Sequence, residues 1–161
     1  MAAGLAAYDD ETRESARDLE EFVRREKKPK AKTIADGAWG KALSWAEEAM
    51  RTGDWGDAAP RHYVAAYALL HERTYGVAPA ELTPTTRLHA AGMAANLLRR
   101  EFDGEPGEMA AFLRWTWQRE KERETWRRAN GRDGGRIGYR LQFTGGLLTD
   151  YRVAKARRAG R

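Results

Sequence analysis

The chain has 161 residues, 42% of them hydrophobic and 33% charged, with a net charge of +5 at neutral pH. This length suits one domain, or a domain with a flexible end, and no apolar run approaches the roughly 20 residues of a membrane span. The absence of cysteine excludes disulfides and thiolate zinc sites, and the N-terminus lacks a basic, apolar leader. We therefore expect a cytoplasmic protein with no contact to a membrane.

Residues 1–32 predict a helix followed by a basic linker. Acidic residues open the segment and basic residues close it, an order that complements the helix dipole. Asp9, Asp10 or Thr12 could cap the helix, and Pro29 ends the pattern. The apolar stripe is narrow and consists of Ala16, Leu19, Phe22 and Val23. A stripe of this width predicts a loosely docked helix, which could equally serve as a partner-binding arm.

Residues 33–130 are predicted to form the helical core. The first helix of this region carries Trp39, Ala42, Leu43, Ala46, Ala49 and Met50 at helical spacing. Trp55 lies in a glycine-flanked turn, after which Pro60 and Gly76 mark the start and the end of a second helix. Thr83 and Pro84 begin a third helix, whose predicted buried stripe runs through Leu88, Ala91, Ala95 and Leu98.

The longest helical segment runs from Pro106 to Asn130 and Gly131, the residues expected to end it. Its first half places Met109, Phe112, Leu113 and either Thr116 or Trp117 on one face. Its second half is almost entirely charged, and the alternating signs of residues 120–124 predict a solvated face. Trp115 and Trp117 cannot both point into the core, because residues two apart on a helix diverge by about 200°.

Residues 131–161 are predicted as a loop rich in glycine and arginine, followed by a basic helix. Tyr139, Leu141 and Phe143 alternate like a short strand, but no other segment offers a strand to pair with them. Apolar residues from Leu147 onward suggest a final helix. The fold class expected is therefore all-α, a single compact domain of five to six helices.

No pattern in the sequence indicates catalysis, a cofactor or a metal site. The three histidines, His62, His71 and His89, do not form the i, i+4 pair that a helical zinc site uses, so we interpret them as core or interface residues. The glycines of residues 130–138 lack the sequence of a Walker A loop, and neither serine lies in a nucleophile elbow. We therefore expect a protein that is not an enzyme.

Positive charge is concentrated at the C-terminal end. Residues 114–161 contain 14 Lys and Arg against 5 Asp and Glu, whereas residues 1–113 contain 15 against 19. Twelve of the 14 cations are arginine, which binds phosphate bidentately and stacks on bases. The simplest alternative is a solvated basic helix face, since solubility alone also requires surface charge.

Aromatic residues are interleaved with these arginines. Trp126 has Glu122 and Asn130 four residues before and after it, so no apolar neighbour covers it on its own helix. It is either covered by another element or exposed, and exposed Trp beside arginine is typical of stacking on unpaired bases. The predicted nucleic-acid-binding residues are Trp126, Arg127, Arg128, Arg132, Arg136, Arg140, Arg152, Lys155, Arg157 and Arg158.

The pattern therefore predicts a non-enzymatic nucleic-acid-binding accessory protein, with DNA favoured over RNA. A helical body with a basic, aromatic end is similar, over residues 112–158, to the C-terminal single-strand-binding parts of phage replication initiators and helicase loaders. This similarity includes no diagnostic motif; it implies a replication, packaging or regulatory factor of a phage or plasmid. The alternative is a protein-binding adaptor or inhibitor whose basic end docks on an acidic protein surface. The sequence leaves the oligomeric state open.

Overall fold

The computed structural model describes residues 32–160, and every regular element within them is a helix. The expected all-α class is confirmed. The predicted helix and linker of residues 1–31 lie outside the described residues. The helices are α2 (Asp36–Thr52), α3 (Pro60–Tyr75), α4 (Pro84–Phe102), α5 (Pro106–Ala129), α6 (Tyr139–Phe143) and α7 (Leu148–Ala159).

Helix ends fall where the sequence predicted them. Gly53 and Gly76, directly after α2 and α3, adopt left-handed φ angles of 79° and 82°, which a residue with a Cβ adopts only at a cost. Thr83 caps α4, because its side-chain oxygen accepts from the Thr86 N–H while Pro84 occupies the first helical position. These residues mark where the helices end or begin through their own backbone and side-chain preferences.

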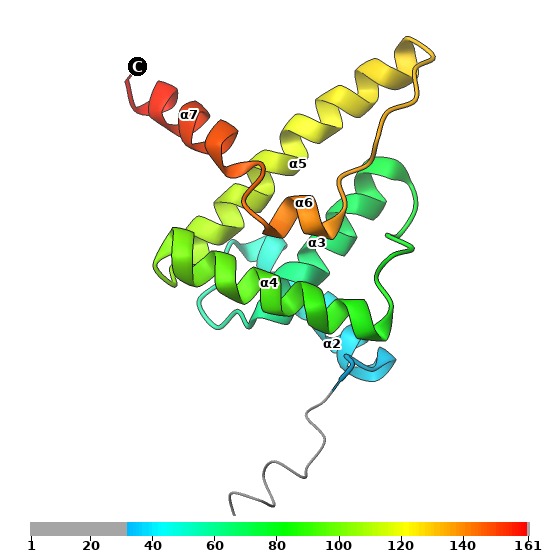
Figure 1. Ribbon diagram of the computed structural model, residues 1–161, viewed down its shortest axis with the longest axis vertical. Coiled ribbons are helices and arrows are strands. Elements are labelled where there is room, and N and C mark those ends of the chain that lie inside the picture. Colours follow the sequence, from blue (N-terminus) through cyan, green and yellow to red (C-terminus); the bar gives the residue numbers. More distant parts are fainter. Residues whose placement is uncertain (1–31, 161) are drawn as a thin grey trace, which may run out of the picture. The chain divides into compact units, whose positions relative to one another are not determined.

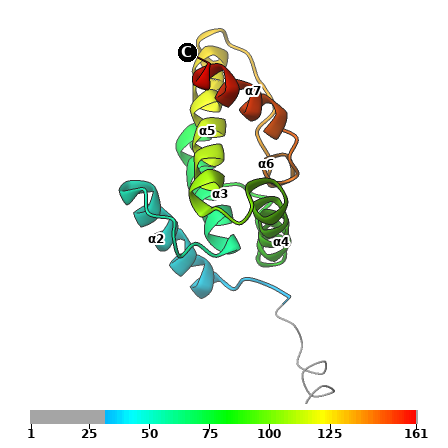
Figure 2. The same cartoon turned by 90° about the vertical axis from the view of Figure 1, so that its left-hand side faces the viewer.

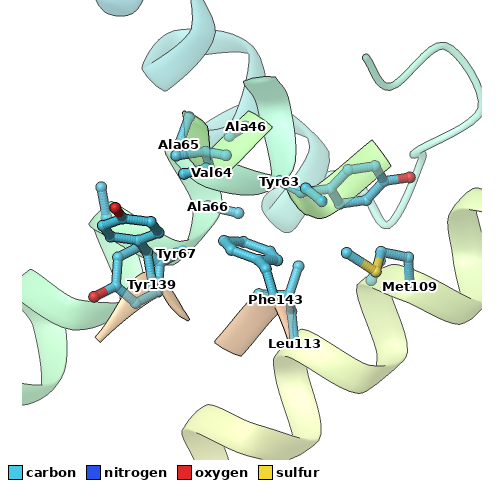
Figure 3. Packing of buried hydrophobic residues seen from close by; sticks show 14 of the residues in the cluster. Ala46, Tyr63, Val64, Ala65, Ala66, Tyr67, Met109, Leu113, Tyr139 and Phe143 are labelled. Atoms are coloured by element: carbon cyan, nitrogen blue, oxygen red, sulfur yellow. The ribbon is translucent and has the colours of Figure 1, made fainter. Parts of the chain in front are cut away.

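Helix α3 is the centre of the core, and α2, α4 and α5 pack against it (Figures 1 and 2). Five consecutive residues, Tyr63 to Tyr67, are almost completely buried, so side chains on every face of this part of α3 pack against other residues. Figure 3 shows Met109 and Leu113 of α5 and Phe143 of α6 packed beside them. Burying an apolar side chain of this size contributes about 1.5–3 kcal/mol, so this cluster is the main source of stability.

The buried face of α4 differs from the predicted one. We expected Leu88, Ala91, Ala95 and Leu98 to face the core, but the buried residues are Ala90, Ala91, Ala94, Leu97 and Phe102. Leu88 is exposed, and Ala95 and Leu98 are only partly buried. Ala91 belongs to both sets, but Ala90 and Ala94 are buried where Leu88 and Leu98 were expected, and α4 packs against α3.

The segment that alternated like a strand forms the short helix α6. Tyr139, Gln142 and Phe143 are buried and Leu141 is exposed, which is a helical rather than a two-residue repeat. The indole N–H of Trp117 donates to Gln142 Oε1 (2.9 Å), a buried hydrogen bond that fixes α6 on α5. Trp115 is partly buried against Tyr151 of α7, so the two tryptophans do point in different directions.

Two histidines lie in the core, as expected. His62 stacks on Trp45 with ring centroids 4.0 Å apart, and its Nδ1 accepts a hydrogen bond from the Ala59 N–H (2.8 Å) at the start of α3. His71 is hydrogen-bonded to the Val77 carbonyl (2.8 Å). Burial lowers the pKa of both side chains below the ordinary value of 6.5. Both imidazoles are therefore neutral at pH 7. Separately, no group of three or more potential metal ligands occurs within residues 32–160.

The lowered pKa of His62 predicts a loss of stability in mild acid. The unfolded chain binds the proton more readily than the folded chain, because burial and the nearby Arg61 guanidinium disfavour a positive charge on the folded imidazole. A protonated Nδ1 also cannot accept from Ala59. The free energy of unfolding therefore keeps its full value above about pH 6.5 and falls as the pH drops below it toward the folded-state pKa. Urea unfolding between about pH 7.5 and 5.5, followed by circular dichroism, measures this decrease.

His62→Gln is the matched variant for this experiment. Glutamine at this helix position keeps an acceptor for the Ala59 N–H but does not titrate in this range. We expect a smaller decrease over the same pH range, with the remainder due to His71. An unchanged pH dependence in His62→Gln would contradict the role given to His62.

None of the helices within residues 32–160 combines the length and the apolar character that crossing a membrane requires.

Candidate nucleic-acid interface

The second half of α5 and the segment that follows it carry the candidate interface. Helix α5 contributes buried residues as far as Glu120 and then extends beyond the other helices (Figure 1). At its end Gly131 adopts a left-handed φ of 60°, the Arg132 N–H donates to the Arg127 carbonyl (2.9 Å), and the chain turns back. Residues 131–137, which we call the return loop, then run back toward α3.

The return loop is held at its far end by two buried tyrosines of α3. The Ile137 N–H donates to the Tyr75 hydroxyl (2.9 Å), and the Tyr67 hydroxyl donates to the Ile137 carbonyl (2.8 Å). Beyond Ile137, the Tyr139 N–H donates to Glu81 Oε1 (2.9 Å). Both main-chain groups of Ile137 are therefore satisfied in the core, and the loop is anchored where its basic part ends.

Glu120 corrects the prediction of a solvated face at residues 120–124. Its side chain is only 4% exposed, and its Oε1 accepts from the Tyr75 hydroxyl (2.9 Å) and from the Arg127 guanidinium. Burial raises the pKa of Tyr75, so this hydroxyl remains a proton donor. Alternating charge indicated a surface, but Glu120 lies one turn beyond Thr116, on the buried face of α5.

Arg127 is consequently a structural residue. Besides its ion pair with Glu120, it donates to the Gly135 carbonyl (3.2 Å) and lies 3.5 Å from a Glu124 carboxylate oxygen. A Cβ at Gly134 would lie 2.5 Å from Arg127 Cδ, so a larger residue there would displace the Arg127 side chain from its place against the return loop. Arg127 was predicted to bind phosphate; in the structure its guanidinium is occupied within the protein.

A hollow of about 540 Å³ opens between the end of α5, the return loop and α6. Its lining residues are Glu120, Arg123, Trp126, Arg127, Gly135, Arg136, Ile137, Leu141 and Leu147. We call it the Trp126 hollow. Trp126 is 54% exposed and Leu141 is 43% exposed, so two large apolar side chains meet solvent here. Sequence reasoning left the exposure of Trp126 open, and the structure places it at this surface.

Three arginines lie on the same surface as Trp126. The guanidinium carbon of Arg132 lies 5.8 Å from the centre of the Trp126 ring, whereas Arg123 and Arg136 line the Trp126 hollow, which Arg132 does not. All three are exposed, and none forms an ion pair within residues 32–160. Arg123 was missed in the sequence prediction, although its position three residues before Trp126 puts both on one helix face.

The other predicted arginines of this region have partners of their own. Arg128 forms an ion pair with Glu124 (3.2 Å) and donates weakly to the Tyr75 carbonyl (3.5 Å). With Arg132 and Arg136 it borders a second, smaller hollow on the return loop. Arg140 lies on α6 with its guanidinium 5.7 Å from the Tyr139 ring, and it lines neither hollow.

The basic residues of α7 lie apart from the Trp126 hollow. Arg152 pairs with Glu101 of α4 (2.6 Å) and Lys155 with Glu108 at the start of α5 (2.8 Å). Arg157 and Arg158 are exposed, but the end of α7 and the end of α5 point in different directions (Figure 1). The structure therefore brings together five of the ten predicted residues, namely Trp126, Arg127, Arg128, Arg132 and Arg136.

Comparisons with models of protein families, with curated proteins and with solved structures gave no match for this chain.

Proposed function

We propose that this protein is a non-enzymatic nucleic-acid-binding accessory protein that contacts its ligand through the Trp126 hollow. One observation carries the proposal: an exposed indole stands among Arg123, Arg132 and Arg136 beside an apolar depression. Aromatic stacking and phosphate neutralisation are the two contributions that proteins combine when they bind single strands. A factor that acts in replication, packaging or regulation in the cytoplasm is consistent with this surface.

We propose a separate task for each group. The Trp126 ring offers a face on which an unpaired base stacks, and Leu141 adds apolar surface to the same hollow. The three arginines supply planar donors to the phosphates on either side of that base. Single-stranded DNA is the proposed ligand, because the bases of a duplex are already stacked on one another.

The proposal predicts a large effect of Trp126→Ala on binding. Loss of the stacking face should weaken binding of a fluorescent oligo-dT by about 1–3 kcal/mol, which is about 5- to 150-fold. Fluorescence anisotropy at about 50 mM salt measures it. Val153→Ala is the matched control, because Val153 is 45% exposed on α7 and lies outside the hollow. Equal affinities of the Trp126→Ala chain and the wild type would remove Trp126 from the interface.

The same titration tests the wider proposal. Affinity should fall steeply between about 50 and about 200 mM salt, and the single strand should bind more tightly than the duplex. Failure of the wild type to bind any oligonucleotide at the lower salt concentration would contradict a nucleic-acid function. The arginines would then be better explained by an acidic protein surface as the partner.

A further inference from the structure

A third hollow, with a volume of about 370 Å³, lies between α2, α3 and α5. Helix α2 lies on one side of α3 and α5, whereas α4, α6 and α7 lie on the other (Figure 2). The hollow shares no lining residue with the Trp126 hollow. We call it the α2–α5 groove, and nothing in the proposed function uses it.

The groove exists because small residues line it where larger ones would close it. Ala66 of α3 and Ala110 of α5 both line it, and a Cβ added at Gly107 would meet nothing within 4 Å. Helix α2 ends at Thr52, and the left-handed Gly53 directs the chain away. The remaining apolar lining consists of Met50, Trp55, Leu70, Leu113 and Trp117. The result is a preformed apolar depression, of the kind that accepts an anchoring side chain.

The charged residues along the groove all have one sign. Arg73, Arg114 and Lys121 line it, and no carboxylate does. Arg73 pairs with Glu47, but Arg114 and Lys121 are exposed and form no ion pair within residues 32–160. The last two are seven residues apart, so they lie on the same edge of α5 at a separation of about 10 Å. Carboxylates two turns apart on another helix have the same spacing.

We propose that the α2–α5 groove is a docking site for an acidic amphipathic helix of a partner protein. Such a helix inserts a large apolar side chain beside Ala66 and Ala110 and places carboxylates next to Arg114 and Lys121. A helix in an apolar groove is a common mode of peptide recognition, and the cations fix the charge of the occupant and its register. The protein then binds nucleic acid on one face and a protein partner on another.

The experiment is a selection from a yeast-displayed library of helical peptides with no bias in net charge, using the full-length chain as bait. Peptides enriched on the wild type should be acidic, with apolar residues at positions i, i+3 or i+4, and i+7. Their affinity should fall by at least about tenfold for Arg114→Glu/Lys121→Glu. A Lys41→Glu/Arg100→Glu chain, which reverses two exposed charges outside the groove, should bind them as the wild type does.

Two further measurements test the proposed docking site. A selection repeated on Arg114→Glu/Lys121→Glu should enrich basic peptides, because the charge of the rim has been reversed. Ala110→Trp should abolish binding by filling the groove, and its circular dichroism should match that of the wild type. Selected peptides without a charge preference, or peptides whose binding ignores the Arg114/Lys121 reversal, would overturn the proposal. So would a wild-type dimer that dissociates on this reversal, since a second copy would then be the occupant.

Discussion

Replacing Arg127 with Met is expected to destabilise the protein by about 3–5 kcal/mol. The substitution leaves the carboxylate of Glu120, a residue only 4% exposed, with the Tyr75 hydroxyl as its one remaining side-chain donor within residues 32–160. A buried charge that loses its partner is costly, because the interior does not replace the solvation that the charge gave up. Urea unfolding of both chains at pH 7, followed by circular dichroism, measures the difference.

The double variant Glu120→Gln/Arg127→Met separates the ion pair from the packing of its atoms. Glutamine is neutral and still accepts from Tyr75, so no unpaired charge remains. We expect most of the lost stability to return, with a coupling of at least about 2 kcal/mol in the double-mutant cycle. If Arg127→Met alone costs less than about 1 kcal/mol, Glu120 is better solvated than the structure indicates.

The same double variant also tests the assignment of Arg127 as structural. Its guanidinium already donates to Glu120 and to the Gly135 carbonyl, so we expect it to contribute little to phosphate binding. At a temperature well below unfolding, the double variant should bind oligo-dT within about threefold of the wild type. A loss of about tenfold would return Arg127 to the phosphate-binding set.

Much of the fold could be predicted from local signals. Gly53 and Gly76 stop two helices because their backbone conformation suits glycine, and Thr83 with Pro84 starts another. These signals act within a few residues, so a single sequence contains them completely. The face of α4 was wrong because it depends on which side chains let α3 approach, and that information lies in two helices at once.

The candidate site shows the same division. The absence of apolar neighbours on its own helix left two outcomes open for Trp126, and only the fold shows that no other element covers it, since it is 54% exposed. The burial of Glu120 was not predicted at all, because its partner Tyr75 is 45 residues away in the sequence. Charge counting also grouped α7 with the return loop, whereas Arg152 and Lys155 reach carboxylates on α4 and α5. Composition locates positive charge along the chain, but only the fold shows which of it has a partner.

A triple variant, Arg123→Ala/Arg132→Ala/Arg136→Ala, is expected to weaken binding of single-stranded DNA about 100-fold at about 50 mM salt. This follows if each lost phosphate contact costs on the order of 1 kcal/mol, so that three cost about 3 kcal/mol. The slope of log affinity against log salt should become shallower by about 2, since single strands lose about 0.7 per contact. Anisotropy titrations at several salt concentrations give both values.

The matched control removes the same amount of charge from α7. Arg152→Ala/Arg157→Ala/Arg158→Ala changes the net charge equally but leaves the Trp126 hollow intact. Deleting the segment after Thr149 is a poorer experiment, because it removes Tyr151, whose ring packs 5.3 Å from Phe112 in the core. Removing charge from α7 should weaken DNA binding only by lowering the long-range electrostatic attraction to the phosphates, because salt screens charges more than about 10 Å apart at 0.1 M.

The comparison of the two triple variants decides where the strand runs. A large loss in the first variant and a loss below about threefold in the second would place the phosphates along α5 and the return loop. Equal losses would extend the path to Arg157 and Arg158, as the sequence predicted. A larger loss in the α7 variant would exclude the Trp126 hollow as the main phosphate site, because three arginines beside an exposed indole would then contribute less than three outside it.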